Sequence, residues 1–267
     1  MKLVVLGSGT SQGIPALGCN CPVCRSRNPR DRRMRASLFV TGSGGEAAVI
    51  DTGPEFRLQA IRAGIRRLDA VFLTHAHADH LHGLDDLRPL TREKPLPVYG
   101  NRATLGEVAE RFAYVFRETQ RGGGKPRIIL TEAETPVSLG SLRFTPLPVK
   151  HGGLDILGWR IDEAGTQAAA VYLTDVSEIP PMARKIIGVH EILIIDGLRA
   201  RPHETHLSFE QALTEAAALG ARRVFLTHIC HDYSHRAVNR FCRAFIRARR
   251  LSGVSMEAAW DGLTVAL

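Results

Sequence analysis

Three histidines and an aspartate lie within seven residues of this chain, in the run Thr74-His75-Ala76-His77-Ala78-Asp79-His80. The run follows the apolar segment 68–73, which predicts a buried strand that ends where the run begins. Open α/β sheets place their chemistry at such strand ends. Imidazole nitrogens and a carboxylate suit Zn²⁺, Mn²⁺ or Fe better than Mg²⁺ or Ca²⁺. The run therefore predicts half of a two-metal hydrolytic site, and the alternative is a solvated histidine-rich turn.

Further candidate ligands recur downstream in matching positions. His151, Asp175 and His228 each come at or just after the end of an apolar segment that predicts a strand. Asp51 also ends such a segment, shortly before Gly53. Because these residues share one kind of position, we expect them to converge with the histidine-rich run, which makes an accidental turn a poor explanation.

The run and the later ligands together resemble the metallo-β-lactamase superfamily, whose H-x-H-x-D-H signature they reproduce along nearly the whole chain. The resemblance implies an α/β fold, the αββα sandwich, in which two mixed β-sheets are flanked by helices. It also implies two divalent metal ions in the active site, Mn²⁺, Zn²⁺ or Fe, with a hydroxide between them as the nucleophile. The resemblance further implies that one metal is held by His75, His77 and His151 and the other by Asp79, His80 and His228, with Asp175 bridging them.

A second metal signal lies in a loop, residues 18–25, where Cys19, Cys21 and Cys24 form the pattern C-x-C-x-x-C. Three thiolates this close favour a structural Zn²⁺ over disulfides, which would leave one cysteine unpaired. The candidate fourth ligand is His231, three residues after a predicted catalytic ligand. Cys230 beside it is either a buried apolar side chain, which we favour, or a competing ligand.

The cysteine site narrows the resemblance to the PhnP-type phosphodiesterases, in which a Cys/His zinc site accompanies the dinuclear centre. Segments 7–15, 19–24 and 226–231 match that pattern. By the resemblance, the family's non-ligand active-site histidine is His206, which we predict to contact the scissile phosphate and to protonate the leaving oxygen. Without the resemblance, His206 is typical of a loop or cap residue before the helix that begins at Phe209.

Four other residues carry weaker predictions. Asp51 matches the superfamily's acidic residue behind the metals, where it would orient a ligand imidazole, although an aspartate before glycine also suits a turn. Asp196 ends an apolar segment and supports the site at most indirectly. His82 and Arg88 are candidates to line the substrate cleft and pair a phosphate, or else belong to an exposed helix start.

Length and composition agree with one hydrolase domain spanning residues 1–267. No apolar stretch approaches the roughly 20 residues of a membrane span. The first residues reach a glycine turn too soon for a signal peptide. Free thiols as zinc ligands indicate a reducing cytoplasm, and a homodimer is the default oligomeric state.

The net charge of +8 and the pI near 9.7 raise the question of a nucleic-acid partner. Nearly all of the positive charge is arginine, as a coding bias would give. The arginines between 240 and 250 alternate with apolar residues at helical spacing, which indicates the solvent side of an amphipathic helix. Neither they nor the arginines between 25 and 35 show interleaved aromatics. We therefore expect a small phosphodiester substrate, drawn by positive potential, and keep a nucleic-acid partner as the weaker alternative.

The remaining pattern predicts strands and one long helix. The segment 105–120 is expected to be helical, with a glycine loop over 122–124 that is a surface turn or borders the substrate entrance. Strands are expected near 2–6, 36–41, 46–51, 68–74, 142–149, 157–162, 168–174, 191–195 and 223–227.

Three functional classes compete on these grounds. The first is a metal-dependent phosphodiesterase acting on a small cyclic or linear diester, such as a ribose cyclic phosphate or a nucleotide-like compound. The second is a tRNase Z-like endonuclease, which shares the metal ligands but grips tRNA with a long Gly/Pro-rich arm that we do not find. The third is a PqqB-like non-hydrolytic biosynthetic protein, which would be expected to lack part of the dinuclear set. A β-lactamase or thioester hydrolase would leave the cysteine site unexplained.

Overall fold

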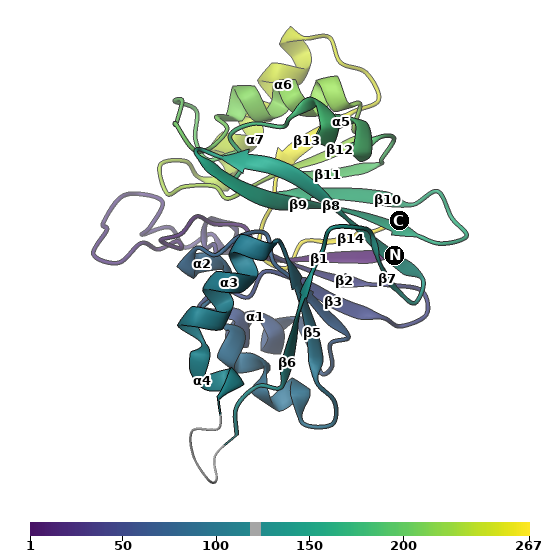
Figure 1. Ribbon diagram of the computed structural model, residues 1–267. Helices are drawn as coiled ribbons and strands as arrows, with labels where there is room; N and C mark the ends of the chain where they lie inside the picture. The colour runs from purple at the N-terminus through teal and green to yellow at the C-terminus, as the bar shows by residue number, and fades with distance from the viewer. Residues whose placement is uncertain (118–123) are drawn as a thin grey trace.

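The computed structural model describes residues 1–117 and 124–267, which form two β-sheets packed face to face with helices on their outer sides (Figure 1). The first sheet contains the N-terminal strands and closes with the last strand of the chain. Its strands β3 to β6 run parallel, and β14, β1 and β2 extend it by antiparallel pairing. In spatial order they are β14 (Thr264–Ala266), β1 (Lys2–Gly7), β2 (Ser37–Thr41), β3 (Ala47–Ile50), β4 (Ala70–Phe72), β5 (Leu96–Gly100) and β6 (Ile128–Glu132).

The second sheet repeats this plan with strands from the C-terminal half. Strands β10 to β13 are parallel, and β9, β8 and β7 are antiparallel to their neighbours. Strands β10 and β11 are buried at every position, which explains their continuous runs of apolar residues. In spatial order they are β13 (Ser255–Ala258), β12 (Arg223–Thr227), β11 (Ile192–Asp196), β10 (Ala169–Leu173), β9 (Leu154–Glu163), β8 (Leu142–His151) and β7 (Val137–Leu139).

Side chains cap the N-termini of some of the helices, among them α6 (Phe209–Leu219) and α7 (His235–Ala248). Ser208 and Gln211 form a capping box at the start of α6, and Ser234 caps α7. Two short 3₁₀ helices, η1 (Pro29–Asp31) and η2 (Leu84–Thr91), complete the set. The α-helices are α1 (Phe56–Ala63), α2 (Ala78–Leu81), α3 (Arg102–Arg111), α4 (Ala113–Phe116), α5 (Pro181–Ile187), α6 (Phe209–Leu219) and α7 (His235–Ala248).

The core has three apolar layers, one between the sheets and one under each set of helices. The layer between the sheets joins both halves of the chain: Phe72 of β4 stacks on Phe144 of β8 with ring centroids 3.9 Å apart, and Trp159 of β9 meets it edge-on. This packing aligns the C-terminal strand ends of the two sheets, where the predicted ligands lie. The predicted αββα sandwich is confirmed.

The nine expected strands are all present, although their ends differ by a few residues. The prediction of one helix over 105–120 is wrong in its bounds. The structure has α3 and α4 instead, because the backbone of Phe112 leaves the helical region at φ −108° and ψ 34°. The last part of that expected helix and most of the expected 122–124 loop fall within 118–123, outside the described residues. Among the helices that are described, none is long and apolar enough to cross a membrane.

Candidate metal centre

The predicted ligands converge at one edge of the sandwich, between the ends of the two sheets. The nitrogen donors of His75, His77 and His151 lie within 4.8 Å of one another. A second group, with donor atoms equally close, consists of Asp79, His80, Asp175 and His228. The structure thus brings together all seven residues that the sequence predicts as ligands of the dinuclear site.

Strained backbone positions aim several of these side chains into the site. Asp51, Asp175 and His228 each follow a strand, β3, β10 and β12, and each has a positive φ, 62°, 58° and 56°. Non-glycine residues seldom adopt this left-handed conformation, and where they do the strain often marks function. The turn after each strand therefore points its side chain across the sheet edge.

Carboxylates hold the imidazoles of the second group. The two oxygens of Asp175 face two different histidines, Oδ2 at 3.1 Å from Nε2 of His80 and Oδ1 at 3.1 Å from Nε2 of His228. Oδ2 of Asp79 lies 3.1 Å from the same His80 nitrogen. Burial opposes ionisation of Asp79, but the neighbouring His80 and His228 hold the pKa of its carboxyl below the usual value.

Asp51 lies behind His80 and fixes its orientation. Its Oδ2 accepts a hydrogen bond from Nδ1 of His80 at 2.8 Å, and both oxygens accept from Thr74, one from the amide and one from the hydroxyl. With Nδ1 engaged, Nε2 of His80 is directed to the ligand cluster. Burial raises the pKa of Asp51. The nearby glycine is required, since a Cβ on Gly53 would lie 2.2 Å from the carbonyl oxygen of Asp79.

The chemistry of the donor set fits a divalent metal. The Nε2 atoms of His75, His80 and His228 are buried and make no hydrogen bond, although carboxylate oxygens lie 3.1 Å from the last two. Such atoms are costly unless something else binds them. Nδ1 of His151 bonds to the carbonyl of Thr205 at 2.8 Å, leaving its other nitrogen for the cluster. His75, His80 and His151 thus have one nitrogen anchored and the other bare, a state typical of metal ligands, whereas neither nitrogen of His228 has a hydrogen bond. His77 differs from the others because its side chain is exposed.

His206 stands beside the ligand cluster and is anchored by Asp196. Its Nδ1 lies 2.8 Å from Oδ2 of Asp196, whose other oxygen is buried without a partner. The His206 ring lies 4.8 Å from the rings of both His151 and His228, one from each ligand group. Burial, with the His228 charge, lowers the pKa of His206 to about 4, and burial raises that of Asp196. The sequence indicated only that Asp196 ends a strand, and the structure shows that it holds His206 by a hydrogen bond.

The cysteine loop forms a second candidate metal site. Cys19, Cys21 and Cys24 place their Sγ atoms 3.3, 3.5 and 3.5 Å from Nδ1 of His231. A tetrahedral zinc with the usual Zn–S and Zn–N bonds separates sulfur from nitrogen by about 3.5 Å. The amide of Cys24 bonds to Sγ of Cys21 and is the main cause that lowers the pKa of this thiol to about 6.

Cys230 is not among the four residues of this second cluster. Its side chain is partly buried, and burial raises its pKa to about 11. This agrees with the expectation of a largely apolar role. The carbonyl of Cys230 instead accepts a hydrogen bond from the fully buried Arg33, which also bonds the carbonyl of Tyr233. One arginine thus holds both sides of the segment that carries His231.

In the part of the chain that the structure describes, the two weaker candidates for the substrate cleft make no hydrogen bond or ring contact with the ligand residues. His82 is exposed at the end of α2, with its ring 6.2 Å from that of Phe112. Arg88 is exposed on η2 and donates to the carbonyl of Gly124. The contact of Arg88 with substrate phosphate stays a prediction.

Sequence reasoning missed three supporting residues. Thr74 and Thr205 orient His75 and His151, at 3.0 and 2.8 Å. The exposed His203 places its ring 5.1 Å from His206. Nothing in their local pattern distinguishes them, because their partners are distant in sequence or depend on a loop conformation.

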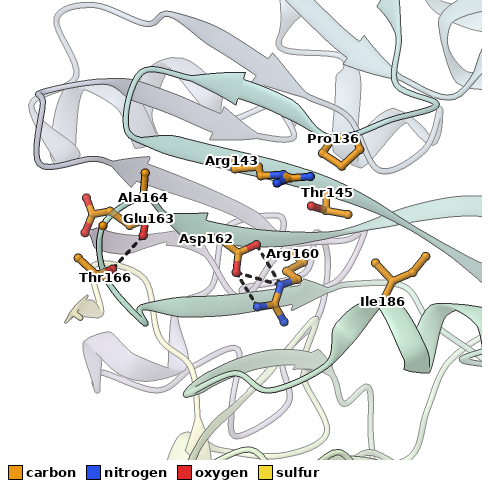
Figure 2. A pocket seen from close by; sticks show the side chains of 10 residues that line it. Pro136, Arg143, Thr145, Arg160, Asp162, Glu163, Ala164, Thr166 and Ile186 are labelled. Carbon is orange, nitrogen blue, oxygen red and sulfur yellow. Dashed lines mark hydrogen bonds and ion pairs between the residues drawn. The ribbon is translucent and has the colours of Figure 1, made fainter.

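A separate cavity of about 490 Å³ lies along β8 and β9 (Figure 2). Its main cation, Arg160, is bound to Asp162 through three contacts and to the carbonyls of Ile187 and Val189. None of the predicted site residues lines this cavity.

The chain is similar to several known proteins. A crystal structure of a diphosphatase from the PhnP family is 37% identical with a TM-score of 0.85, and the match covers 100% of this chain and 97% of that one. Coenzyme PQQ synthesis protein B of Methylobacterium radiotolerans is 30% identical over 75% of this chain and 69% of that protein. An octanoyltransferase of Porphyromonas gingivalis is 39% identical over 86% of this chain but only 46% of its own length.

More than half of the octanoyltransferase has no counterpart here, so its name describes a protein about twice the matched length. The family model for the β-lactamase superfamily domain matches residues 48–229, which include every predicted ligand of the dinuclear site. The sandwich fold and the 37% identity to a PhnP-family structure agree with that match. The chain belongs to the metallo-β-lactamase superfamily and is a PhnP-like member of it.

Proposed function

We propose that this chain is a metal-dependent phosphodiesterase that hydrolyses a small cyclic or linear phosphodiester with two divalent metal ions, Mn²⁺ or Zn²⁺. The observation that carries the proposal is the His206–Asp196 pair, at 2.8 Å, beside a cluster of seven metal-ligand side chains. Such a site combines a place for cations with a separate group that can donate a proton. The similarity to a diphosphatase supports a substrate that contains phosphorus.

Each group of residues has a distinct part. His75, His77 and His151 would hold one metal, Asp79, His80 and His228 the other, and Asp175 would contact both. Bound there, the ions would supply Lewis acidity and lower the pKa of water. Asp51 keeps His80 in one orientation.

His206 does the proton transfer in this proposal. Asp196 accepts from Nδ1, so the imidazole presents Nε2 to the substrate. The step requires the imidazolium form of His206, which the negative charge of a bound phosphodiester would favour by raising the pKa of His206 from its value in the substrate-free protein. The Nε2 proton then passes to the leaving oxygen as its bond to phosphorus breaks, which leaves a neutral imidazole and a free alcohol. The four residues of the cysteine cluster would hold a structural Zn²⁺ that ties the N-terminal loop to the segment after β12.

Two substrates with different leaving groups test the role of His206 as proton donor. Bis(p-nitrophenyl) phosphate releases a stabilised phenolate that needs little protonation, whereas a nucleotide 2′,3′-cyclic phosphate releases an alkoxide that needs it. We expect His206→Ala to reduce kcat for the cyclic phosphate by about 10²–10⁴-fold and to affect the nitrophenyl diester much less.

Glu204→Gln is the control, because Glu204 is an exposed residue of the same loop and should leave both rates nearly unchanged. Equal losses for the two substrates in His206→Ala would contradict the proton-donor role. If neither diester is hydrolysed by the metal-loaded enzyme, while precursor tRNA is cut or no phosphoryl substrate reacts, the tRNase Z-like or PqqB-like alternative replaces the proposal.

A further inference from the structure

Helix α7 carries a row of positively charged side chains on its solvent side. Arg236, Arg240, Arg243 and Arg247 are spaced i, i+4, i+7 and i+11, which places them in a narrow sector of the helix over roughly 16 Å. All four are exposed. We refer to these four residues as the α7 arginine row.

The row has no carboxylate of its own. Residues 235–250 contain no Asp or Glu. Among the described residues the ion pairs engage other arginines, such as Arg184 with Glu215 and Arg201 with Asp232. The α7 arginine row is therefore an unneutralised surface, unlike a row of helical salt bridges.

A second basic segment adjoins the N-terminal end of α7. The amide of His235 donates to the buried Asp31, and the guanidinium of Arg30 lies 4.2 Å from the ring centre of Trp260, on which His235 packs. Burial and the charges of Arg30 and Arg33 lower the pKa of His235 to about 4, a sign of positive potential there. The exposed arginines of this segment are Arg25, Arg27, Arg30 and Arg32.

We propose that the α7 arginine row, with the adjoining loop arginines, is a docking surface for the phosphate backbone of a nucleic acid. A linear array of arginines matches a linear array of phosphates, and its guanidinium groups can bond phosphate oxygens in pairs. The sequence alone identified only the solvent side of a helix; the structure adds the alignment, the missing carboxylates and the second basic segment. The inference goes beyond the proposed hydrolase function and does not rest on it.

The residues on the other faces of α7 indicate which kind of partner the helix can bind. Helix α7 packs on the second sheet (Figure 1). Its residues Val238, Cys242 and Phe245 are buried in the core, so the helix has no free apolar side to insert into a lipid bilayer. The exposed row also has no aromatic side chain on which bases could stack. The surface therefore suits the backbone of a double helix and carries no sequence readout.

The test is binding of a fluorescently labelled DNA duplex of about 20 base pairs, followed by anisotropy as a function of salt. The four phosphate contacts of the α7 arginine row contribute about −3.6 to the slope of log K against log salt, or a roughly 150-fold loss of affinity between 50 and 200 mM salt, and contacts of the loop arginines would add to it. The variant R240Q/R243Q/R247Q should make that slope shallower by about 2.7 and weaken binding at low salt more than tenfold.

The matched control is R57Q/R62Q/R66Q, which removes the same charge from exposed positions in and just after α1. It should retain nearly the wild-type slope, and far-UV circular dichroism with thermal melting should show that both variants are folded. Equal losses in the two variants would overturn the proposal, because net charge alone would explain binding. Absence of duplex binding by the wild type at 50 mM salt, or binding only to phosphatidylserine vesicles, would overturn it as well.

Discussion

At the scale of single residues, the candidate metal centre depends on the metal-ligand side chains and also on the residues that orient them. Asp51 is fully buried, yet it makes three hydrogen bonds, two to Thr74 and one to His80. Its local sequence fits a turn equally well, so only the contact with His80 distinguishes the two roles. The positive φ of Asp175 and His228 was likewise not predictable, because the strain is sustained by packing from distant segments.

Replacing Asp51 tests this supporting role. We expect Asp51→Asn to weaken metal binding at the centre by about 10–100-fold, since an amide cannot both accept from His80 and keep its two bonds from Thr74. Competition with a chelator of known affinity measures the change. The control Asp69→Asn removes a carboxylate that pairs with Arg67 and Lys94 on the surface, and it should leave metal affinity unchanged. Wild-type affinity in Asp51→Asn would contradict the role.

At the scale of elements, the long buried strands were predictable and the short strands were not. Long apolar runs such as β10 and β11 are visible in the sequence because every residue is buried. The prediction omitted β5, β6, β7, β13 and β14, which have three to five residues and include Pro97 in β5. Short strands with mixed exposure lack the alternation that identifies a strand, and tertiary pairing decides them.

The segment between β12 and α7 is the connection on which both candidate metal sites depend. It carries His228 and His231, and Arg33 spans it by bonding the carbonyls of Cys230 and Tyr233, each at 3.1 Å. Arg33→Met would leave two carbonyls without donors. We expect this variant to lose about 2–4 kcal/mol of unfolding free energy, measured by urea denaturation.

Arg32→Met, at the exposed neighbouring position, is the control and should change the unfolding free energy by less than about 0.5 kcal/mol. A loss of the same small size in Arg33→Met would show that Arg33 does not hold the segment.

A substitution in the cysteine loop should lower stability, whereas a substitution in the dinuclear site should abolish turnover. We expect Cys21→Ala to lower the melting temperature by about 5–10 °C, because it removes one of four ligands from a site that joins two distant segments. Turnover per folded molecule should be largely kept below the transition. A variant with an unchanged melting temperature and zinc content would contradict a structural zinc at this loop.

At the scale of the whole molecule, the two ends of the chain close one sheet. β1 pairs with β14, and Asp261 ties the last segment to the first by accepting from the amide and hydroxyl of Ser8 and from the amide of Met34. The core between the sheets contains residues from both halves. We propose on this basis that residues 1–267 form one cooperative domain, which near-UV and far-UV circular dichroism should report as a single coincident transition.

Asp261 also predicts how stability depends on pH. Burial raises its pKa to about 6 in the folded protein, against about 3.9 in an unfolded chain. The folded state thus binds the extra proton, and the stability gained from it is complete below the unfolded pKa and is lost as the pH rises through the folded pKa. Between pH 5 and 7.5 we expect the unfolding free energy of the wild type to fall by about 1–2 kcal/mol relative to Asp261→Asn. A difference that stays constant over this range would contradict the raised pKa.

The central claim, a dinuclear centre beside a structural zinc, is tested most directly by the metal content of the purified chain after reconstitution with Mn²⁺ or Zn²⁺, measured by mass spectrometry. We expect close to three metals per chain, with hydrolysis of bis(p-nitrophenyl) phosphate that depends on them, and we expect Asp175→Ala to abolish this turnover while the fold is kept. A single tightly held zinc without turnover, or normal activity in Asp175→Ala, would contradict the two-metal account.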